Sequence, residues 1–264
     1  MTGTGQTGAM DTHDASSRVR PRGTIVTLGG GGFSESEDGS SRIDDLLIEL
    51  TGRERPRVCF VPTASADDAD YSARFAAAFA GRAETGVLSL FGRDPWGYRD
   101  PALLLEQDLI YVGGGSTVNL LALWHRHDLP AILERAVAGG TVLAGISAGM
   151  NCWFEASSTD SFGPLEPLPE GLGFLPDAAC PHYHGEPTRR PLLHEWVAAG
   201  RFPATWAVDD GAALVWRDGE LIEAVSEDDG VGAWRVTRER AEVAAGDAGP
   251  FVAVEDPIPV RRLR

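Results

Sequence analysis

The sequence contains no lysine, so all 23 of its basic residues are arginine. This excludes Schiff-base chemistry on a lysine and the lysine of a Walker-A phosphate loop. The three cysteines, Cys59, Cys152 and Cys180, are too few and too scattered for a disulfide framework, which favours a reducing cytoplasm. No apolar run approaches the roughly 20 residues of a membrane span, and the N-terminus lacks the apolar core of a secretion signal. We therefore expect a cytoplasmic protein that has no membrane partner.

Positive charge is scarce relative to negative charge. The 23 basic residues face 39 acidic ones, so the formal net charge is −16 and no nucleic-acid partner is expected. Apolar residues make up 43% of the 264 residues, which is enough for a large buried core. Residues 1–22 hold hardly an apolar side chain, which predicts a disordered leader. No linker or repeat divides the remainder, so residues 23–264 are expected to form a single α/β domain.

Short apolar runs that predict buried strands alternate with segments of helical spacing. The expected strands are 24–28, 57–61, 86–91, 108–112 and 141–144, and the expected helices are 43–50, 71–80, 118–125 and 130–138, with a short helix inside 95–105. This alternation predicts a doubly wound, mostly parallel sheet with helices on both faces. Residues 155–190 are rich in proline, glycine, serine and acidic residues and break the pattern. A further helix begins near Pro191, and short edge strands are expected at 206–208, 212–216, 220–225, 230–237 and 251–254.

The fifth expected strand ends in a Gly-x-Ser-x-Gly pattern. The apolar run 141–144 leads into Gly145-Ile146-Ser147-Ala148-Gly149. In a nucleophile elbow the chain turns sharply from strand to helix and holds the serine at the apex, and the flanking glycines avoid collisions across the turn. The pattern therefore predicts Ser147 as a nucleophile, with the backbone N–H of Ala148 aimed at the group that it attacks. The alternative is a glycine-rich turn that contains a serine by chance.

Glycine-rich turns also follow two other expected strands, at 29–32 and 113–115. In a parallel sheet the carboxyl ends of the strands lie at one edge, where ligands bind, so all three turns are expected to border one cleft. The first turn is not interpreted as a dinucleotide fingerprint. Ser34 occupies the third glycine position, and no acidic ribose ligand ends a second strand at the usual distance.

A serine nucleophile needs a base and a carboxylate that orients the base. Of the six histidines, His182 and His184 are the candidates, because they lie in the irregular region after the elbow. The carboxylates in reach are Glu155, Asp160 and Asp177. A metal site made of His182, His184 and either Cys180 or Asp177 is an alternative, but it leaves the elbow and the glycine turns unexplained.

Four motifs occur together in this chain: Gly-Gly-Gly-Ser-Thr at 113–117, Gly-Ile-Ser-Ala-Gly at 145–149, Thr159-Asp160 and Pro181-His182. Together they resemble the peptidase E family of serine peptidases, which includes aspartyl dipeptidases and the more distant cyanophycinases. The resemblance runs in element order from about residue 24 to residue 225. It implies a flavodoxin-like sheet similar to that of class I glutamine amidotransferases. It also implies a catalytic triad of Ser147, Asp160 and His182, an oxyanion hole formed by the amides of Gly115 and Ala148, and no metal or organic cofactor.

Family members that cleave after an N-terminal aspartate carry a motif resembling Gly-Glu-Thr-Arg shortly after the histidine, with the arginine gripping the substrate carboxylate. Here residues 185–190 read Gly-Glu-Pro-Thr-Arg-Arg. This segment has one residue more than the family motif, and fewer residues separate it from His182. Arg189 and Arg190 are therefore candidate substrate-binding residues, together with Gly114, since a bidentate guanidinium suits a carboxylate. The alternative is a surface pair or an ion pair with Glu186.

His184-Gly185-Glu186 leaves a second triad open, because glutamine amidotransferases use a histidine and a glutamate two residues later. We favour His182, which follows proline as in peptidase E and lies 22 residues (182 − 160) after Asp160.

The predicted function is hydrolysis of small peptides through an acyl-enzyme, with N-terminal aspartate as the hypothetical preference. Cyanophycinase-like cleavage of an Asp–Arg polymer and a non-catalytic binding role on the same fold are the alternatives. Trp153 and Phe154 beside the elbow are expected to pack into the core rather than line a pocket. A homodimer is one possible assembly.

Overall fold

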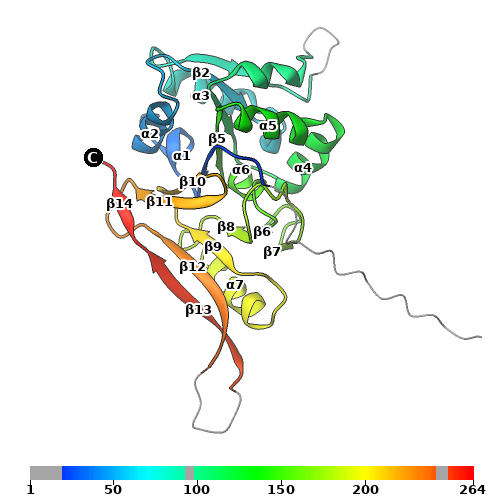
Figure 1. Ribbon diagram of the computed structural model, residues 1–264, viewed down its shortest axis with the longest axis vertical. Helices are drawn as coiled ribbons and strands as arrows, with labels where there is room; N and C mark the ends of the chain where they lie inside the picture. The colour runs from blue at the N-terminus through cyan, green and yellow to red at the C-terminus, as the bar shows by residue number, and fades with distance from the viewer. Residues whose placement is uncertain (1–19, 93–97, 242–248) are drawn as a thin grey trace, which may run out of the picture.

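The computed structural model describes residues 20–92, 98–241 and 249–264 (Figure 1). The expected leader lies outside the described residues except for residues 20–22, and part of the expected 95–105 connection lies outside them as well. Within the described residues, no helix is both long and apolar enough to cross a membrane.

The larger of two sheets contains eight strands in the order β14-β11-β10-β1-β5-β4-β2-β3. Its parallel part is made of β1 (Thr24–Leu28), β5 (Val142–Ile146), β4 (Leu109–Val112), β2 (Arg57–Val61) and β3 (Glu84–Val87). β10 (Ala212–Arg217) and β11 (Glu220–Ser226) extend it as an antiparallel pair, and β14 (Val260–Arg262) closes that edge. The predicted mostly parallel sheet flanked by helices is confirmed. β3 ends earlier than expected, because its partner β2 ends at Val61 and is followed by a proline.

Helices cover both faces of this sheet, and alternate residues of the central strand β5 point to opposite faces. Val142 and Ala144 contact the core under α2 (Arg42–Leu50) and α3 (Ala69–Ala78). Leu143 contacts the core under α4 (Thr117–Arg126), α5 (Leu129–Ala138) and the 3₁₀ segment η3 (Pro101–Glu106). A strand buried on both faces has to be apolar throughout, which explains why its sequence shows no polar alternation.

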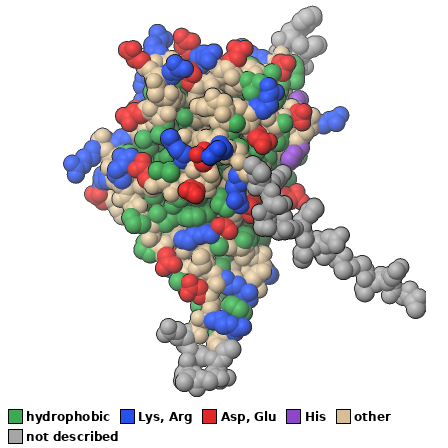
Figure 2. Space-filling view, viewed as in Figure 1, with side chains coloured by type: hydrophobic (Ala, Val, Ile, Leu, Met, Phe, Trp, Pro, Cys, Tyr) green, Lys and Arg blue, Asp and Glu red, His purple; other side chains and the backbone are tan. Residues whose placement is uncertain are grey.

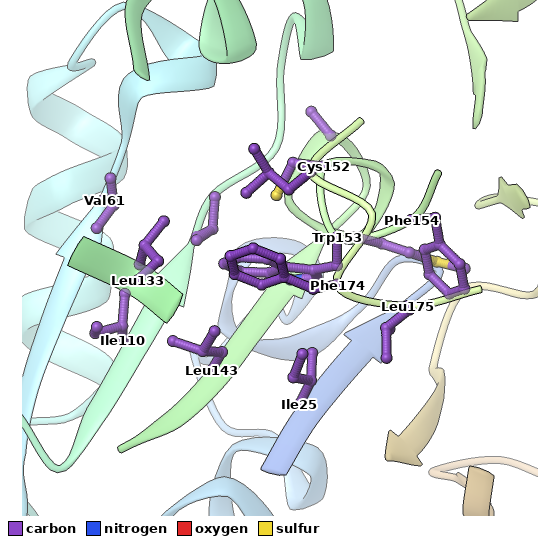
Figure 3. Packing of buried hydrophobic residues seen from close by; sticks show 14 of the residues in the cluster. Ile25, Val61, Ile110, Leu133, Leu143, Cys152, Trp153, Phe154, Phe174 and Leu175 are labelled. Atoms are coloured by element: carbon purple, nitrogen blue, oxygen red, sulfur yellow. The ribbon is translucent and has the colours of Figure 1, made fainter. Parts of the chain in front are cut away.

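The core beneath the expected elbow contains the two aromatic residues that follow it. Figure 3 shows Trp153 and Phe154 among the aliphatic side chains of the sheet, with Phe174 beside Trp153. The rings of Trp153 and Phe174 stack with their centroids 5.8 Å apart. Both Trp153 and Phe154 are fully buried, which agrees with the expectation that they pack into the core.

A second sheet was not foreseen. Its six strands run in the order β13-β12-β9-β8-β6-β7. They are β13 (Phe251–Ile258), β12 (Ala233–Arg240), β9 (Thr205–Val208), β8 (Ala178–Cys180), β6 (Ala156–Thr159) and β7 (Glu166–Leu168). Three of them lie within residues 155–190. They are only three or four residues long, and the proline and glycine around them make such short strands hard to recognise in the sequence. α7 (Arg189–Ala198) packs on this sheet, and the β12–β13 pair forms the lower end of the molecule in Figure 1.

The second sheet places the carboxyl ends of β8 and β9 beside those of β1 and β5. β8 and β9 are parallel neighbours, with Cys180 opposite Ala207. After β9 the chain crosses to the larger sheet, where Gly30 and Asp210 form an isolated bridge and Gly211 N–H donates to the Gly30 carbonyl at 3.1 Å. The two sheets therefore meet at the glycine turn that follows β1.

A buried carboxyl group supports this turn from α2. Asp44 is 1% exposed, and its Oδ2 accepts the Phe33 N–H at 2.8 Å. Ser41 caps the same helix by accepting the Asp44 N–H at 3.2 Å. Burial raises the pKa of Asp44 to about 7, because the charged form has lost its hydration.

The raised pKa of Asp44 predicts a pH-dependent stability. The folded state holds this proton more tightly than the unfolded chain, so its stabilising effect is present below about pH 4 and is lost as the pH rises to about 7. Across that window the free energy of unfolding should fall by about 1.4 kcal/mol per pH unit from this group. Urea unfolding of Asp44→Asn should lack this fall, whereas Asp45→Asn, at an exposed neighbour, should keep it. An unchanged pH dependence in Asp44→Asn would contradict the assignment.

Candidate active site

Ser147 lies at a sharp turn between β5 and the short helix α6 (Ala148–Asn151). Its backbone has φ 56° and ψ −112°, a conformation that L residues rarely adopt and that costs about 1–3 kcal/mol. Two hydrogen bonds hold the turn: Ser147 N–H donates to the Leu28 carbonyl at 3.1 Å, and Asn151 N–H donates to the Ser147 carbonyl at 2.9 Å. The serine is therefore held at the apex, as the Gly-x-Ser-x-Gly pattern predicts.

The two glycines of the pattern are required by close backbone approach. A Cβ at Gly145 would lie 2.1 Å from the Gly149 carbonyl oxygen, and a Cβ at Gly149 would lie 2.4 Å from that of Val112. No side chain fits at either distance, because real Cβ contacts essentially never fall below 3.0 Å. The turn can therefore form only with glycine at both positions.

His182 contacts Ser147 directly. The residue follows β8, has φ 51°, and its side chain is 15% exposed. Its Nε2 lies 2.9 Å from Ser147 Oγ and its Nδ1 lies 2.5 Å from Asp210 Oδ1. An ionised carboxylate can only accept, so Nδ1–H donates to Asp210 and Nε2 is left to accept the Ser147 hydroxyl proton. The structure thus brings together a serine, an imidazole and a carboxylate in one hydrogen-bonded row.

The carboxylate in this row is Asp210 and not Asp160, which corrects the expectation from the resemblance. β6 and β9 lie on opposite sides of β8. After β6, Asp160 is exposed, and the chain turns toward α4, where Ser161 Oγ accepts the Val118 N–H at 3.4 Å. After β9 the chain turns toward β1 and carries Asp210 to His182.

Two glycines enclose Asp210. A Cβ at Gly30 would lie 2.0 Å from Asp210 Oδ1 and 2.9 Å from His182 Nδ1, and a Cβ at Gly185 would lie 2.1 Å from Asp210 Oδ2. The backbone therefore packs directly against the hydrogen bond between histidine and aspartate. The glycine turn after β1 does border the site, as expected, and its second glycine is needed for this contact.

Two backbone N–H groups near Ser147 are left for an oxyanion. In the described part of the chain, neither Gly115 N–H nor Ala148 N–H has a hydrogen-bond partner, whereas Gly114 N–H donates to Tyr71 Oη at 3.3 Å. Gly115 has φ 133°, and a Cβ there would lie 2.2 Å from the Ala64 carbonyl oxygen. A Cβ at Gly114 would lie 3.8 Å from Ser147 Oγ, so the turn after β4 borders the serine.

Both candidate substrate-binding arginines are paired within the protein. Arg189 is 3% exposed and forms a bidentate pair with Glu186, with Nε–Oε2 at 2.8 Å and Nη2–Oε1 at 3.1 Å. Arg190 donates from Nε to Glu255 Oε2 at 2.8 Å. The ion pair with Glu186, which the sequence left open as an alternative, is the arrangement that the structure shows for Arg189.

The second triad is not assembled. His184 Nδ1 lies 3.0 Å from Asp209 Oδ1, which also accepts the His184 N–H at 3.1 Å. Asp209 is buried and also accepts the Gly232 N–H at 3.1 Å, so it ties the His184 turn to the start of β12. Glu186 is paired with Arg189. With His184 held by Asp209 and Glu186 by Arg189, neither residue is hydrogen-bonded to Ser147.

The metal site considered from the sequence is not formed either. Asp177 pairs with Arg235, and burial raises the pKa of the Cys180 thiol to about 11. Among the described residues, the group whose donor atoms are close enough to share an ion is Glu35, His182 and Asp210, all within 4.8 Å of one another. Two of these three already form the row with Ser147.

A serine at a strained strand–helix turn, hydrogen-bonded to an imidazole that is held by a carboxylate, is an arrangement typical of serine hydrolases. The model of peptidase family S51 matches residues 25–224 of the chain. The chain belongs to peptidase family S51 and is a serine peptidase.

Curated relatives agree with this family, and solved structures agree with the fold. An uncharacterized peptidase, YgaJ, of Bacillus subtilis (strain 168) is 43% identical over 240 residues, covering 90% of this chain and 98% of that protein. Peptidase E of Streptomyces coelicolor is 33% identical over 184 residues, covering 64% of this chain and 73% of that protein. The crystal structure of a peptidase from an acI-B1 Actinobacterium covers 89% of this chain and 99% of that one with a TM-score of 0.57 at 17% identity. A putative peptidase E from Listeria monocytogenes EGD-e covers 76% and 97% with a TM-score of 0.56 at 19% identity, so these two structures support the fold.

Proposed function

We propose that the chain hydrolyses small peptides by acyl transfer to Ser147, with His182 as the base and Asp210 as the carboxylate that orients it. The observation that carries this proposal is the row Ser147 Oγ–His182 Nε2–Nδ1–Asp210 Oδ1, with separations of 2.9 and 2.5 Å. Ser147 becomes nucleophilic as its proton passes to His182 Nε2, and Asp210 stabilises the imidazolium that results.

The reaction needs stabilisation of a negative oxygen after the attack. The free N–H groups of Gly115 and Ala148 supply it in this proposal, since each is preorganised by a turn and has no internal partner among the described residues. His182 then gives its proton to the leaving amine, and a water molecule activated by the same base hydrolyses the acyl-enzyme. Deleting one oxyanion donor in comparable sites lowers kcat by about 10²–10³.

Substrate charge is the second part of the proposal. Arg189 and Arg190 are each neutralised by an internal carboxylate, Glu186 and Glu255. A substrate carboxylate would have to compete with a bidentate pair whose guanidinium is buried. We therefore propose a peptidase that does not require an N-terminal aspartate. On the face of the molecule that Figure 2 shows, acidic and basic side chains are interspersed.

The test is a panel of dipeptides with Asp, Glu, Arg or Ala before leucine, together with an Asp–Arg polymer. The proposal predicts cleavage of Asp-Leu and Ala-Leu with kcat/KM values within about tenfold of each other. Cleavage confined to Asp-Leu would overturn the proposal on substrate charge and would show that Arg189 or Arg190 is released for binding. Cleavage of the polymer alone would favour the cyanophycinase-like alternative, and cleavage of none by the folded protein would favour a binding role.

A further inference from the structure

A second carboxylate lies beside the histidine–aspartate pair and has no part in the mechanism above. Glu35 is in α1 (Gly32–Glu35), the short helix that follows the glycine turn after β1. One carboxylate oxygen of Glu35, one ring nitrogen of His182 and one carboxylate oxygen of Asp210 all lie within 4.8 Å of one another. The Gly31 N–H donates to Glu35 Oε2 at 2.8 Å and fixes the side chain across its own turn.

The charge of Glu35 is not neutralised by an arginine. Among the described residues Glu35 forms no ion pair, whereas Arg82 pairs with Asp45 and Arg262 pairs with Asp229. Arg74 donates to the Ser34 carbonyl and lies over the Tyr71 ring. Glu35 is exposed, but partial loss of its hydration and, next, the negative charge of Asp210 raise its pKa, while the Gly31 hydrogen bond and His182 lower it. Two carboxylates thus share one imidazole, and their repulsion is relieved when that imidazole becomes a cation.

The other charged groups around Glu35 come from three elements. Glu227, after β11, lies on the Gly31 side and accepts hydrogen bonds from Ser41 Oγ and the Ile43 N–H. Burial and, to a smaller extent, the charge of Glu35 raise the pKa of Tyr71 in α3. Arg42, Asp45 and Asp228 line the same cavity as Glu35 and Asp210. Asp45 is paired with Arg82. Arg42 is the single cation among the residues that line this cavity, so the surroundings of Glu35 are predominantly acidic.

We infer that Glu35 is a positioning residue that acts through His182, by stabilising the imidazolium formed when Ser147 attacks. This inference rests on the proposed function. It adds a second carboxylate, besides Asp210, whose negative charge lies close to the His182 ring. Glu35 exchanges no proton: the proton moves from Ser147 Oγ to His182 Nε2 and later to the leaving amine. Like Asp210, Glu35 favours the protonated ring through its charge, but it does so across a gap rather than through a hydrogen bond.

Glu35→Gln tests this inference, because glutamine keeps a carbonyl oxygen for the Gly31 N–H and loses only the charge. The readout is the rate at which a fluorophosphonate probe labels Ser147 between about pH 5 and pH 9. Without the charge, the ring is protonated less readily, so the acidic limb should move about 0.5–1 pH unit lower. The plateau rate should fall about 3–10-fold, because the imidazolium in the transition state is less stabilised.

The controls separate charge from structure. Glu35→Asp keeps the charge and should keep the acidic limb within about 0.3 pH unit of the wild type, as should Glu37→Gln at an exposed position two residues further on. If Glu35→Gln lowered the plateau labelling rate but left the acidic limb of the pH profile in place, Glu35 would have only a structural role. That result would overturn this inference and leave the proposed function standing. A wild type that the probe does not label at any pH would overturn the proposed function, and the inference with it. Matching thermal melts establish that each variant is folded.

Discussion

Ser147→Ala is expected to lower kcat for the best substrate of the dipeptide panel by about 10⁵–10⁶-fold. The alanine removes the oxygen that forms the acyl-enzyme and leaves the turn intact, because its Cβ occupies the position of the serine Cβ. His182, Asp210 and the oxyanion donors remain in place and can supply only the residual acceleration that such sites retain without their nucleophile. The measurement is steady-state hydrolysis followed by chromatography of the released leucine.

The matched control is Ser72→Ala, which changes a partly exposed serine on α3 and should leave kcat unchanged. Purification of both variants by the same route excludes a contaminating peptidase as the source of any activity. If Ser147→Ala kept more than about 1% of the wild-type rate, a water molecule would have to be the nucleophile. The acyl-enzyme mechanism would then be wrong.

Asp210→Asn is expected to lower kcat by about 10³–10⁴-fold, whereas Asp160→Asn should change it by less than about threefold. The asparagine amide can meet His182 Nδ1 as a donor, which favours the tautomer with the proton on Nε2 and leaves no lone pair to accept the Ser147 proton. Asp160 is exposed, and its recorded hydrogen bond is through its backbone carbonyl, which accepts the Gly163 N–H at 2.8 Å. Losing the Asp160 charge therefore leaves the row of catalytic atoms undisturbed.

The two aspartate variants decide between the site derived from the structure and the site implied by the resemblance. Binding should be preserved in both, so the loss in Asp210→Asn should appear in kcat with KM changed little. The opposite ranking, with Asp160→Asn inactive and Asp210→Asn active, would return the orienting role to Asp160. It would also mean that the contact between Asp210 and His182 is not the one used in catalysis.

Local sequence patterns were sufficient for the parallel sheet and for singling out Ser147 and His182, which the structure places in contact. β1 and β2 have the predicted bounds, because each is a run of only five residues, rich in β-branched or aromatic side chains and followed by glycine or proline, and these features favour a strand over a buried helix. Ser147 was found from a pentapeptide whose glycines are required by contacts within the same turn and with the neighbouring strand β4. His182 was found because few histidines compete for the role and because it follows a proline as in the resembling family.

Asp210 was missed because its position depends on pairing between distant segments. Its sequence neighbourhood, Val208-Asp209-Asp210-Gly211, reads as a turn after a short strand. Only the parallel pairing of β8 with β9, and the crossing of the chain to Gly30, bring Asp210 to His182. A carboxylate followed by glycine at the carboxyl end of a strand is a usable signal, because ligands bind at that edge of the sheet.

The short strands of the second sheet, and the choice between the two roles left open for Arg189, could not be predicted for a related reason. Strands such as β7 and β8, of three residues each, are too short for a period of two to be recognised. Arg189 and Glu186 are three residues apart, a spacing that suits an ion pair on a helix as well as an arginine free to bind substrate. The difference lies in the burial of Arg189, which only the packing of α7 on the second sheet determines.

The central claim is that His182 and Asp210 make Ser147 a nucleophile, and covalent labelling tests it without knowledge of the substrate. Wild-type protein is incubated with a fluorophosphonate, its mass is measured intact, and the modified peptide is sequenced by fragmentation. The account predicts one adduct per chain, located on Ser147, formed at least about 10³-fold more slowly in Asp210→Asn and at the wild-type rate in Asp160→Asn. No adduct on folded wild-type protein, or an adduct on any other residue, would contradict it.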